Sequence, residues 1–357
     1  MSQDPFRIDS HKLIYHPQRV SNWLEGQMVY PVYMELSPSG TCNQRCIFCG
    51  VDFMGYQTRF LDPDLLAERL KEMGQLGVKS IMYGGEGEPF LHKHMVRILR
   101  DTHGSGIDAA VTTNAVLMTR DKSEAVLDVV EWVKVSMNAG TPGTYSKIHG
   151  CNPAQFNLAL KNLEDAANII ARNGYRCVLG AQILLLPENR NEVETLARLV
   201  RDIGLRYLVV KPYSQHPQSH TTLYQDVTYA DAQNLAERLD ELATSNFKPL
   251  VRLNTMKKWD EKARPYKTCL ALPFWSYIDT GGNVWGCSVF LTDPRFAYGN
   301  IYDNTFEEIW TGQTRRKSLE WATNTFDPSD CRINCHMDEV NRYLWELKNP
   351  PAHVNFI

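Results

Sequence analysis

The sequence predicts an α/β protein built on a partial (βα)6 barrel of the TIM type, with a small α+β module behind it. From Val32 to about Lys211, short β-rich segments alternate with segments of helical periodicity, which is typical of βαβ units around a parallel sheet. After Ser219 this alternation stops, and a different pattern follows. The 357 residues suffice for one barrel-sized core and one smaller unit.

Six strands and their crossover helices account for the barrel. The expected strands are Val32–Leu36, Ser80–Tyr83, Asp108–Thr112, Trp132–Ser136, Cys177–Leu186 and Leu205–Val210. In the first crossover, Asp62 is the expected N-cap and Pro63 the first helical residue. Later helices are expected at His94–Thr102, Arg120–Val130, Ala154–Arg172 and Val193–Ile203.

The expected domain boundaries follow these changes of pattern. They are an N-terminal arm at 1–30, the barrel at 31–220, a helical connector at 221–265, the second module at 266–340 and a tail at 341–357. In the second module, Tyr277–Asp279 and Val284–Gly286 flank Thr280-Gly281-Gly282-Asn283, which predicts a β-hairpin.

Charge and composition exclude several classes of protein. Lys and Arg number 38 against 41 Asp and Glu, so the basic surface that nucleic-acid binding requires is not expected. The first residues lack the pattern of a signal peptide, and no apolar run approaches the ~18 residues of a membrane span. We therefore expect a cytoplasmic protein with a small-molecule substrate. In that compartment nine cysteines favour metal ligation over disulfides.

The first cysteine group lies directly after the first strand. Cys42, Cys46 and Cys49 place three thiols within eight residues of one loop. Three thiolates can hold a [4Fe–4S] cluster while one iron keeps an open position. The alternative is a structural zinc site, which requires four ligands, and no fourth Cys or His follows nearby.

This loop resembles that of the radical S-adenosylmethionine (SAM) superfamily, whose Cys-x3-Cys-x-aromatic-Cys motif it matches with Phe48 as the aromatic residue. The resemblance implies that the open iron chelates SAM. It also implies that one electron, from a flavodoxin or ferredoxin-type donor, cleaves SAM to a 5′-deoxyadenosyl radical that abstracts hydrogen from the substrate.

A second motif, Gly84-Gly85-Glu86, follows the second strand. Glycines there let a ligand approach the backbone closely. The resemblance implies that this turn binds the SAM ammonium group. The alternative is a phosphate-binding loop, but no Gly-Lys-Ser/Thr follows, and Glu86 and Glu88 would repel phosphate.

Polar residues also follow the later strands, at the end where barrels place their active sites. The resemblance implies SAM contacts there, with ordinary barrel packing as the alternative. The residues are Thr112, Asn114, Ser136, Asn138, Gln182, Leu184, Lys211 and Tyr213. Beyond the sixth strand, Ser214, Gln215 and His216 add polar groups, so Glu88, Lys211, Tyr213, Gln215 and His216 are the expected substrate contacts. A solvated loop is the other interpretation.

The second cysteine group comprises Cys269, Cys287, Cys331 and Cys335. Its pattern of a hairpin, Gly282-x4-Cys287 and a late cysteine pair resembles the SPASM/twitch extension of radical SAM enzymes. Four cysteines instead of seven imply the shorter twitch arrangement, with one auxiliary [4Fe–4S] cluster that transfers electrons or serves structure. A zinc knuckle is the alternative.

Cys151 and Cys177 remain. Lone cysteines are most often small buried hydrophobes. Cys151 follows the loop after strand four, so it is the candidate hydrogen-atom donor that an epimerase would need.

Two functions from different classes remain open. The first is a dehydrogenase or epimerase of a carbohydrate-like substrate, such as a nucleotide sugar or aminocyclitol. The second is a peptide maturase that modifies a ribosomal precursor peptide. A non-catalytic iron–sulfur electron carrier is a third, but it needs no Gly-Gly-Glu turn.

Overall fold

The structure, a computed structural model, describes residues 4–356 and confirms the α/β partial barrel. Within these residues one sheet runs in the order β10-β9-β8-β1-β2-β3-β4-β5-β6-β7. The six predicted strands are present and pair in parallel. They are β1 (Tyr33–Leu36), β2 (Ser80–Tyr83), β3 (Asp108–Thr113), β4 (Val130–Ser136), β5 (Val178–Leu185) and β6 (Tyr207–Pro212).

A seventh parallel strand, β7 (Lys248–Val251), pairs with β6 and was not predicted from the sequence. It is four residues long and contains Pro249, so it lacks the β-rich pattern of the other strands. Proline is tolerated because β7 is the edge strand of the sheet. Its Leu250 packs with Tyr207 and with Phe6 of the N-terminal arm.

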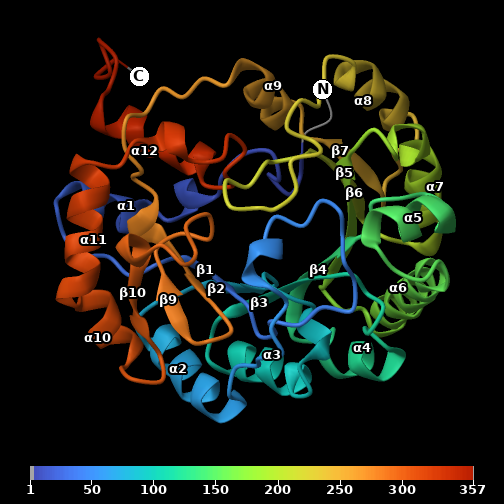
Figure 1. Cartoon of the computed structure of the whole chain (residues 1–357), viewed down its shortest axis with the longest axis horizontal. Helices are drawn as coiled ribbons and strands as arrows, with labels where there is room; N and C mark the ends of the chain where they lie inside the picture. The colour runs from blue at the N-terminus through green and yellow to red at the C-terminus, as the bar shows by residue number, and fades with distance from the viewer. Residues whose placement is uncertain (1–3, 357) are drawn as a thin grey trace.

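Helices cover the outer face of the barrel, as Figure 1 shows. They are α2 (Pro63–Gln75), α3 (Met95–Gly104), α4 (Arg120–Val126), α5 (Pro142–His149), α6 (Ala154–Asn173) and α7 (Val193–Ile203). The Asp62 carboxylate caps α2 by accepting hydrogen bonds from the backbone N–H groups of Asp64 and Leu65, both at 2.9 Å. Helix α5 was not predicted. The other helices are α1 (Pro17–Leu24), α8 (Ala232–Asp240) and α9 (Leu253–Glu261).

The C-terminal module continues the barrel sheet. The predicted hairpin forms from β8 (Trp275–Ile278) and β9 (Asn283–Trp285), and β10 (Ala297–Asn300) extends it. Strand β8 pairs in parallel with β1, with Tyr33 opposite Trp275 and Glu35 opposite Tyr277. The helices α10 (Phe306–Thr311), α11 (Gln313–Asn324) and α12 (Asp338–Lys348) complete the module.

The inward face of the barrel is hollow. Along β1 and β2, side chains alternate between fully buried and half-buried. The buried set, such as Met34 and Ile81, packs against the helices. The half-buried set points inward, and it includes Glu35, Met82, Thr112, Lys134, Ser136 and Lys211. Because inward side chains keep access to solvent, the barrel encloses open space rather than a packed core.

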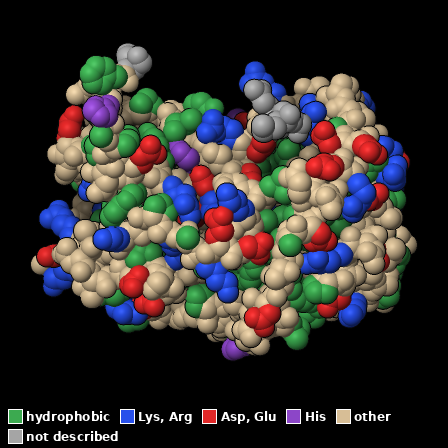
Figure 2. Space-filling view, turned by 90° about the horizontal axis from the view of Figure 1, so that it is seen from above, with side chains coloured by type: hydrophobic (Ala, Val, Ile, Leu, Met, Phe, Trp, Pro, Cys, Tyr) green, Lys and Arg blue, Asp and Glu red, His purple; other side chains and the backbone are tan. Residues whose placement is uncertain are grey.

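Basic and acidic side chains are interspersed over the face shown in Figure 2, in line with a net charge of −3. Within residues 4–356, the helices are too short or too polar to cross a membrane.

Candidate functional site

The three thiols Cys42, Cys46 and Cys49 lie in one loop after β1, at the carboxyl end of the parallel strands. Burial raises the pKa of each thiol, that of Cys42 to about 11. Cys49 further raises the pKa of Cys42 and of Cys46, and Cys42 further raises that of Cys46. Such coupling requires the three sulfurs to face one region. A metal centre would relieve this cost, because it stabilises thiolates.

Backbone contacts with neighbouring loops hold this cysteine loop in place. The Glu88 N–H donates to the Thr41 carbonyl at 2.9 Å, and the Arg45 N–H donates to the His149 carbonyl at 2.9 Å. Gly87 lies so close to Thr41 that a Cβ atom would overlap the backbone of that residue. The loop is therefore preorganised.

A histidine contacts the middle cysteine. Nδ1 of His149, at the end of α5, lies 3.2 Å from the Cys46 sulfur. Its Nε2 lies 3.1 Å from the Met137 carbonyl and 3.4 Å from the Asn138 side-chain nitrogen. Burial lowers the pKa of His149 to about 4, so the ring is neutral. The Phe48 ring packs edge-on against it at 5.7 Å.

The Gly84–Glu86 turn joins the barrel to the C-terminal hairpin. Gly85 has a φ of +104°, which favours glycine, and it lies against Tyr277 and Ser37. The buried Glu86 carboxylate accepts hydrogen bonds from the backbone N–H and the hydroxyl of Thr280, at 2.9 and 3.0 Å. This carboxylate therefore holds the hairpin tip rather than facing open space.

Glu88, an expected substrate contact, is also buried, and its carboxylate is hydrogen-bonded within the protein. Its carboxylate accepts hydrogen bonds from the Thr113 hydroxyl at 2.6 Å and from the backbone N–H groups of Asn114 and Phe90 at 2.9 and 3.1 Å. In this structure it ties the loops after β2 and β3 together.

The polar residues at the strand ends divide into two groups. Ser136 and Gln182 face the hollow, where the Gln182 amide donates to the Ser136 hydroxyl at 2.7 Å. Asn138 is buried, and its side-chain oxygen accepts from the Leu184 N–H at 2.8 Å. At the end of β3, Thr112 contacts the Met82 sulfur at 3.2 Å, and the Asn114 amide donates to the Asn43 side chain at 2.7 Å.

The residues after β6 form a loop that packs over the cysteine loop; the two appear in yellow and blue at the centre of Figure 1. Lys211 still faces the hollow and donates to Gln182 at 3.4 Å. Tyr213 and His216 are buried, however, and the Gln215 amide is bonded to backbone carbonyls of its own loop. The Ser219 hydroxyl donates to the Cys49 carbonyl at 3.1 Å. The structure thus places Tyr213, Gln215 and His216 in loop packing.

The four C-terminal thiols come together at a second place. Cys269, Cys287, Cys331 and Cys335 line one cavity, beside Trp275 and Met337. The Cys331 thiol donates to Cys335, and this hydrogen bond lowers the pKa of Cys335 and raises that of Cys331. Within residues 4–356, no three Cys, His, Asp or Glu side chains are grouped tightly enough for a single metal ion. Four thiols around one shared space have the donor chemistry of a cluster site.

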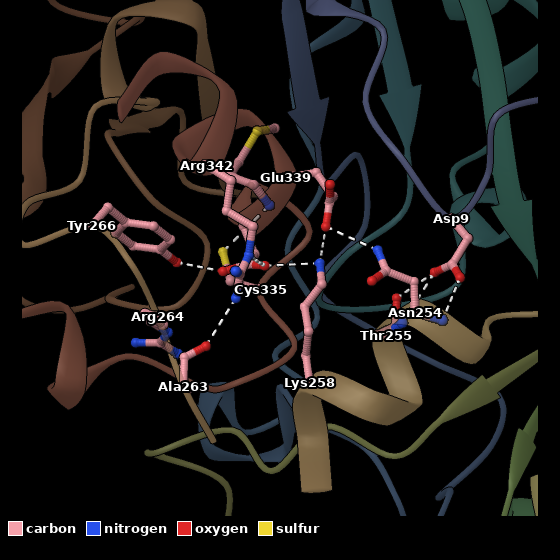
Figure 3. A network of polar contacts seen from close by, with 12 residues as sticks. Asp9, Asn254, Thr255, Lys258, Ala263, Arg264, Tyr266, Cys335, Glu339 and Arg342 are labelled. Carbon is pink, nitrogen blue, oxygen red and sulfur yellow. Dashed lines mark hydrogen bonds and ion pairs between the residues drawn. The ribbon is translucent and has the colours of Figure 1, made fainter. Parts of the chain in front are cut away.

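A polar network anchors this second site, as Figure 3 shows. The buried Asp338 carboxylate, at the start of α12, accepts hydrogen bonds from Tyr266 at 2.6 Å, Arg342 at 2.8 Å and Lys258 at 2.9 Å. Burial alone would raise the pKa of Asp338, but these donors lower it. The network fixes α12 directly behind Cys335.

Loops of the C-terminal module close the open side of the partial barrel. The Asn334 amide donates to the Tyr213 carbonyl at 3.2 Å, and His216 lies 3.4 Å from the Ser288 carbonyl. His336 approaches the inward Glu35 at 3.5 Å. The hollow is therefore bounded by the three-thiol loop at one end and by the four-thiol segment on its side.

The two remaining cysteines pack against the hydrophobic core of the barrel. The Cys151 sulfur lies 3.9 Å from the Gln44 amide. Cys177 is buried in the barrel core. A cavity of about 510 Å³ lies at the opposite, amino-terminal end of the strands, beneath the N-terminal arm.

Sequence reasoning missed Glu35, Lys134, His149, Arg332 and His336. Glu35 and Lys134 interrupt β-rich strands with a charge, and this pattern could have indicated an inward polar face. His149, Arg332 and His336 reach the site only through tertiary contacts, which no local pattern reveals.

Comparison with known proteins agrees with this geometry. The family model of the radical SAM superfamily matches residues 36–200, and that of an iron–sulfur cluster-binding domain, SPASM, matches residues 269–336. A cofactor-modifying protein for tungsten-containing aldehyde ferredoxin oxidoreductase, from Pyrococcus furiosus, is 21% identical over 86% of this chain and 89% of its own.

Other relatives match the barrel alone. A probable GTP 3′,8-cyclase of Methanosarcina acetivorans is 25% identical over 48% of this chain, and a GTP 3′,8-cyclase of Haemophilus influenzae is 29% identical over 53%. The match spans only 51% and 58% of the length of these two cyclases. Among solved structures, Streptococcus suis SuiB bound to its precursor peptide SuiA has a TM-score of 0.67 at 16% identity, covering 94% of this chain and 77% of SuiB.

A partial barrel with a three-thiol loop and a four-thiol site defines an iron–sulfur enzyme of the barrel type. The chain carries a radical SAM domain over residues 36–200 and a C-terminal SPASM domain over residues 269–336. Its cofactors are accordingly SAM, a [4Fe–4S] cluster and an auxiliary iron–sulfur cluster.

Proposed function

We propose that this enzyme oxidises a hydroxyl-bearing carbon of a small polar molecule bound in the barrel hollow. The observation that carries the proposal is the position of the hollow between the two thiol sets. A substrate there lies next to both a hydrogen-abstracting centre and an electron acceptor, as oxidation of an alcohol to a ketone requires.

The residues that hold the cofactors follow from their grouping. Cys42, Cys46 and Cys49 hold the SAM-binding cluster, and Gly84–Glu86, Phe48 and the ends of the strands surround SAM. The auxiliary cluster is held by Cys269, Cys287, Cys331 and Cys335, which line one cavity. When bound, these cofactors supply the 5′-deoxyadenosyl radical and the acceptor of the second electron.

The chain itself binds and orients the substrate. Ser136, Gln182 and Lys211 form a hydrogen-bonded row along the inward face, suited to hydroxyl groups. Ketone formation removes one hydrogen atom, one electron and the hydroxyl proton. The inward Glu35 carboxylate, which accepts from the Tyr33 hydroxyl at 3.0 Å, is the group that takes this proton.

The relatives support a small-molecule substrate in two ways. The Pyrococcus furiosus protein, which matches this chain over most of its length, is named for modifying a cofactor, and the cyclases are named for GTP. SuiB instead favours a peptide substrate, because its structure holds a precursor peptide. A peptide substrate is therefore the alternative that the experiment must separate.

The test is to incubate the anaerobically reconstituted enzyme with SAM, a reductant and pools of sugar phosphates, nucleotide sugars and aminocyclitols, and to follow 5′-deoxyadenosine by mass spectrometry. We expect one pool to stimulate 5′-deoxyadenosine formation and to yield a product lighter by two hydrogens. A product of unchanged mass that takes up deuterium from D2O would instead show epimerisation. Stimulation only by a peptide encoded beside the gene would contradict the proposal.

A further inference from the structure

A groove on the surface of the protein reaches the four-thiol site from outside. Cys269 lines two separate spaces, namely the inner cavity that it shares with the other three cysteines and an outer groove of about 460 Å³. Of the four thiols, Cys269 alone lines the groove. The groove lies outside the inner cavity, so a cluster held by the four thiols leaves it open. Cys269 is therefore the link between the four-thiol site and the surface.

Four segments form this groove, and they lie together on one side of the molecule (Figure 1). They are the end of α1 with the loop after it, residues 269–273, α11 and the end of α12. Trp23, Met28 and Leu319 make its lining partly apolar, and the Met28 side chain is 49% exposed. The Lys348 ammonium lies 4.7 Å from the centre of the Trp23 ring. The groove thus combines apolar surface with positive charge.

Hydrogen bonds from α12 fix the wall that separates the two spaces. The side-chain oxygen of the buried Asn341 accepts from the backbone N–H groups of Leu270 and Ala271, at 2.7 and 3.0 Å. The side-chain amide of Asn341 also donates to the Cys269 sulfur at 3.6 Å. One side chain therefore holds both Cys269 and the backbone after it, so the link between site and groove is preorganised.

The charged side chains that line the groove are all basic. They are Arg315, Arg316 and Lys348, and among the described residues no Asp or Glu lines it. Arg316 and Lys348 are exposed, whereas Arg315 is buried. The exposed acids of the same segments, which lie outside the lining, are Glu25, Glu320 and Glu346. The groove therefore presents positive charge locally although the whole chain has a net charge of −3.

We propose that this groove is the docking face for a small acidic electron-carrier protein. The proposal rests on the proposed function, in which one electron per turnover reaches the four-thiol site and must leave before the next turnover. Basic side chains beside apolar surface are complementary to an acidic protein, and redox partners associate through small, transient interfaces.

The step moves one electron and changes no bond. The cluster at the four-thiol site is oxidised by one electron, and the one-electron centre of the carrier is reduced by one. Because electron transfer slows steeply with distance, the carrier has to dock beside a ligand of the cluster. Cys269 is the ligand that the groove offers.

The experiment measures binding of an acidic [2Fe–2S] ferredoxin to the reconstituted enzyme by biolayer interferometry, at about 20 and about 300 mM NaCl. We expect binding that weakens at the higher salt concentration, and no binding of a basic cytochrome c. Arg316→Glu and Lys348→Glu should each weaken ferredoxin binding at low salt by about fivefold or more, because each removes an attraction and adds a repulsion. Arg316→Lys keeps the charge and should bind like wild type.

Arg198→Glu is the matched control, because it changes the net charge of the protein by the same amount. Arg198 is exposed on α7, which lies at the opposite end of the molecule from α11 (Figure 1). This variant should bind ferredoxin like wild type. Arg316 and Lys348 are also exposed, so the groove variants should melt at the wild-type temperature. Weakened binding without a loss of stability then reports the docking face itself.

Electron transfer is tested in the variant that lacks Cys42, Cys46 and Cys49, because it keeps the four-thiol site alone. After reduction with dithionite and removal of the excess, mixing with oxidised ferredoxin should oxidise this cluster and reduce the ferredoxin one for one. Adding Lys348→Glu should slow the reaction at low salt by about fivefold or more, in line with the weaker association. A ferredoxin that binds in the groove but takes up no electron would overturn the proposal.

Three outcomes of the binding experiment would also overturn it. They are absence of ferredoxin binding to wild type, equal binding by wild type and the groove variants, and equal weakening by Arg198→Glu. Sedimentation of the enzyme alone tests the other occupant. A dimer that dissociates in high salt and is lost in Arg316→Glu would assign the groove to a second copy of the chain instead.

Neither measurement involves turnover of a substrate, so the two proposals fail separately. An enzyme that docks ferredoxin in the groove and passes an electron to it, but yields no oxidised product, contradicts only the proposed oxidation. An enzyme that yields oxidised product while its groove variants bind ferredoxin like wild type contradicts only the docking face.

Discussion

Gly85 offers a sharp test of the turn that joins the two domains, because its neighbour Gly84 provides a matched control. An alanine at Gly85 would have to adopt a φ of +104°, and its Cβ atom would overlap the Tyr277 hydroxyl and lie 3.0 Å from the Ser37 Cβ atom. At Gly84, the nearest atom to a new Cβ is 3.7 Å away, and no positive φ is imposed. The same added methyl group therefore clashes at Gly85 and fits at Gly84.

The expected loss of stability in Gly85→Ala is the sum of a backbone cost and a packing cost. Backbone strain at a sparsely populated φ costs about 1–3 kcal/mol, and overpacking against a buried neighbour costs a further ~1–3 kcal/mol. We expect Gly85→Ala to lower the free energy of unfolding by about 2–6 kcal/mol and Gly84→Ala by less than about 1 kcal/mol. Because Gly85 lies in the predicted SAM turn, Gly85→Ala should also weaken SAM binding.

Thermal melting followed by circular dichroism, together with calorimetric SAM titration, measures both effects. Adding Tyr277→Phe to Gly85→Ala removes the overlapping hydroxyl, so the double variant should recover the packing part of the loss while the backbone part remains. Equal melting temperatures for Gly84→Ala and Gly85→Ala, or no recovery in the double variant, would refute the reasoning.

Three further predictions concern the supports of the site. His149→Ala should shift the potential of the SAM-binding cluster to more negative values by on the order of tens of millivolts. A thiolate at Cys46 favours the neutral tautomer whose Nδ1–H donates to it while Nε2 accepts from the Asn138 amide, and the substitution removes this donor. An unchanged potential in an EPR-monitored redox titration would contradict this. Asp338→Asn should destabilise the protein by about 3–5 kcal/mol at pH 7, because it breaks a buried charge network. Since the folded pKa of Asp338 is lowered, its stabilising contribution is present above the ordinary Asp pKa of about 3.9 and is lost as pH falls through the folded pKa. Urea unfolding of the iron-free protein at pH 7 and pH 3.5 should show that the difference in free energy of unfolding between wild type and variant is smaller in acid. An equal difference at both pH values would exclude this role. Glu35→Gln should preserve 5′-deoxyadenosine formation but lower the yield of oxidised product at least tenfold, and an unchanged yield in a product assay would remove Glu35 as the proton acceptor.

Most of the barrel could be predicted because its signals are local. Strands β1–β6 combine β-rich segments with glycines and helix caps, such as Asp62, that lie within a few residues of them. Strand β7 could not be predicted, because its four residues and Pro249 become a strand only when β6 offers an edge. The pairing of β8 with β1 is likewise a long-range contact between residues more than two hundred apart.

The functional site shows the same division between features with local sequence signals and features that depend on long-range contacts. The two thiol sets could be predicted, since each follows from the spacing of a few cysteines. The loop residues Tyr213, Gln215 and His216 were expected to face a substrate, but the structure turns them into packing against the cysteine loop. The charged lining of the hollow depends on which face each strand turns inward, and on a C-terminal segment that folds back over the barrel.

The central claim is that two separate thiol sets hold two clusters around one hollow. Iron content and SAM cleavage of the anaerobically reconstituted protein test it most directly, compared with variants in which Cys42, Cys46 and Cys49, or the four C-terminal cysteines, are replaced by alanine. We predict about eight irons for wild type and about four for each variant, as expected of two four-iron clusters. SAM cleavage should be absent in the three-cysteine variant. A wild type that never exceeds four irons, or a three-cysteine variant that still cleaves SAM, would contradict the account.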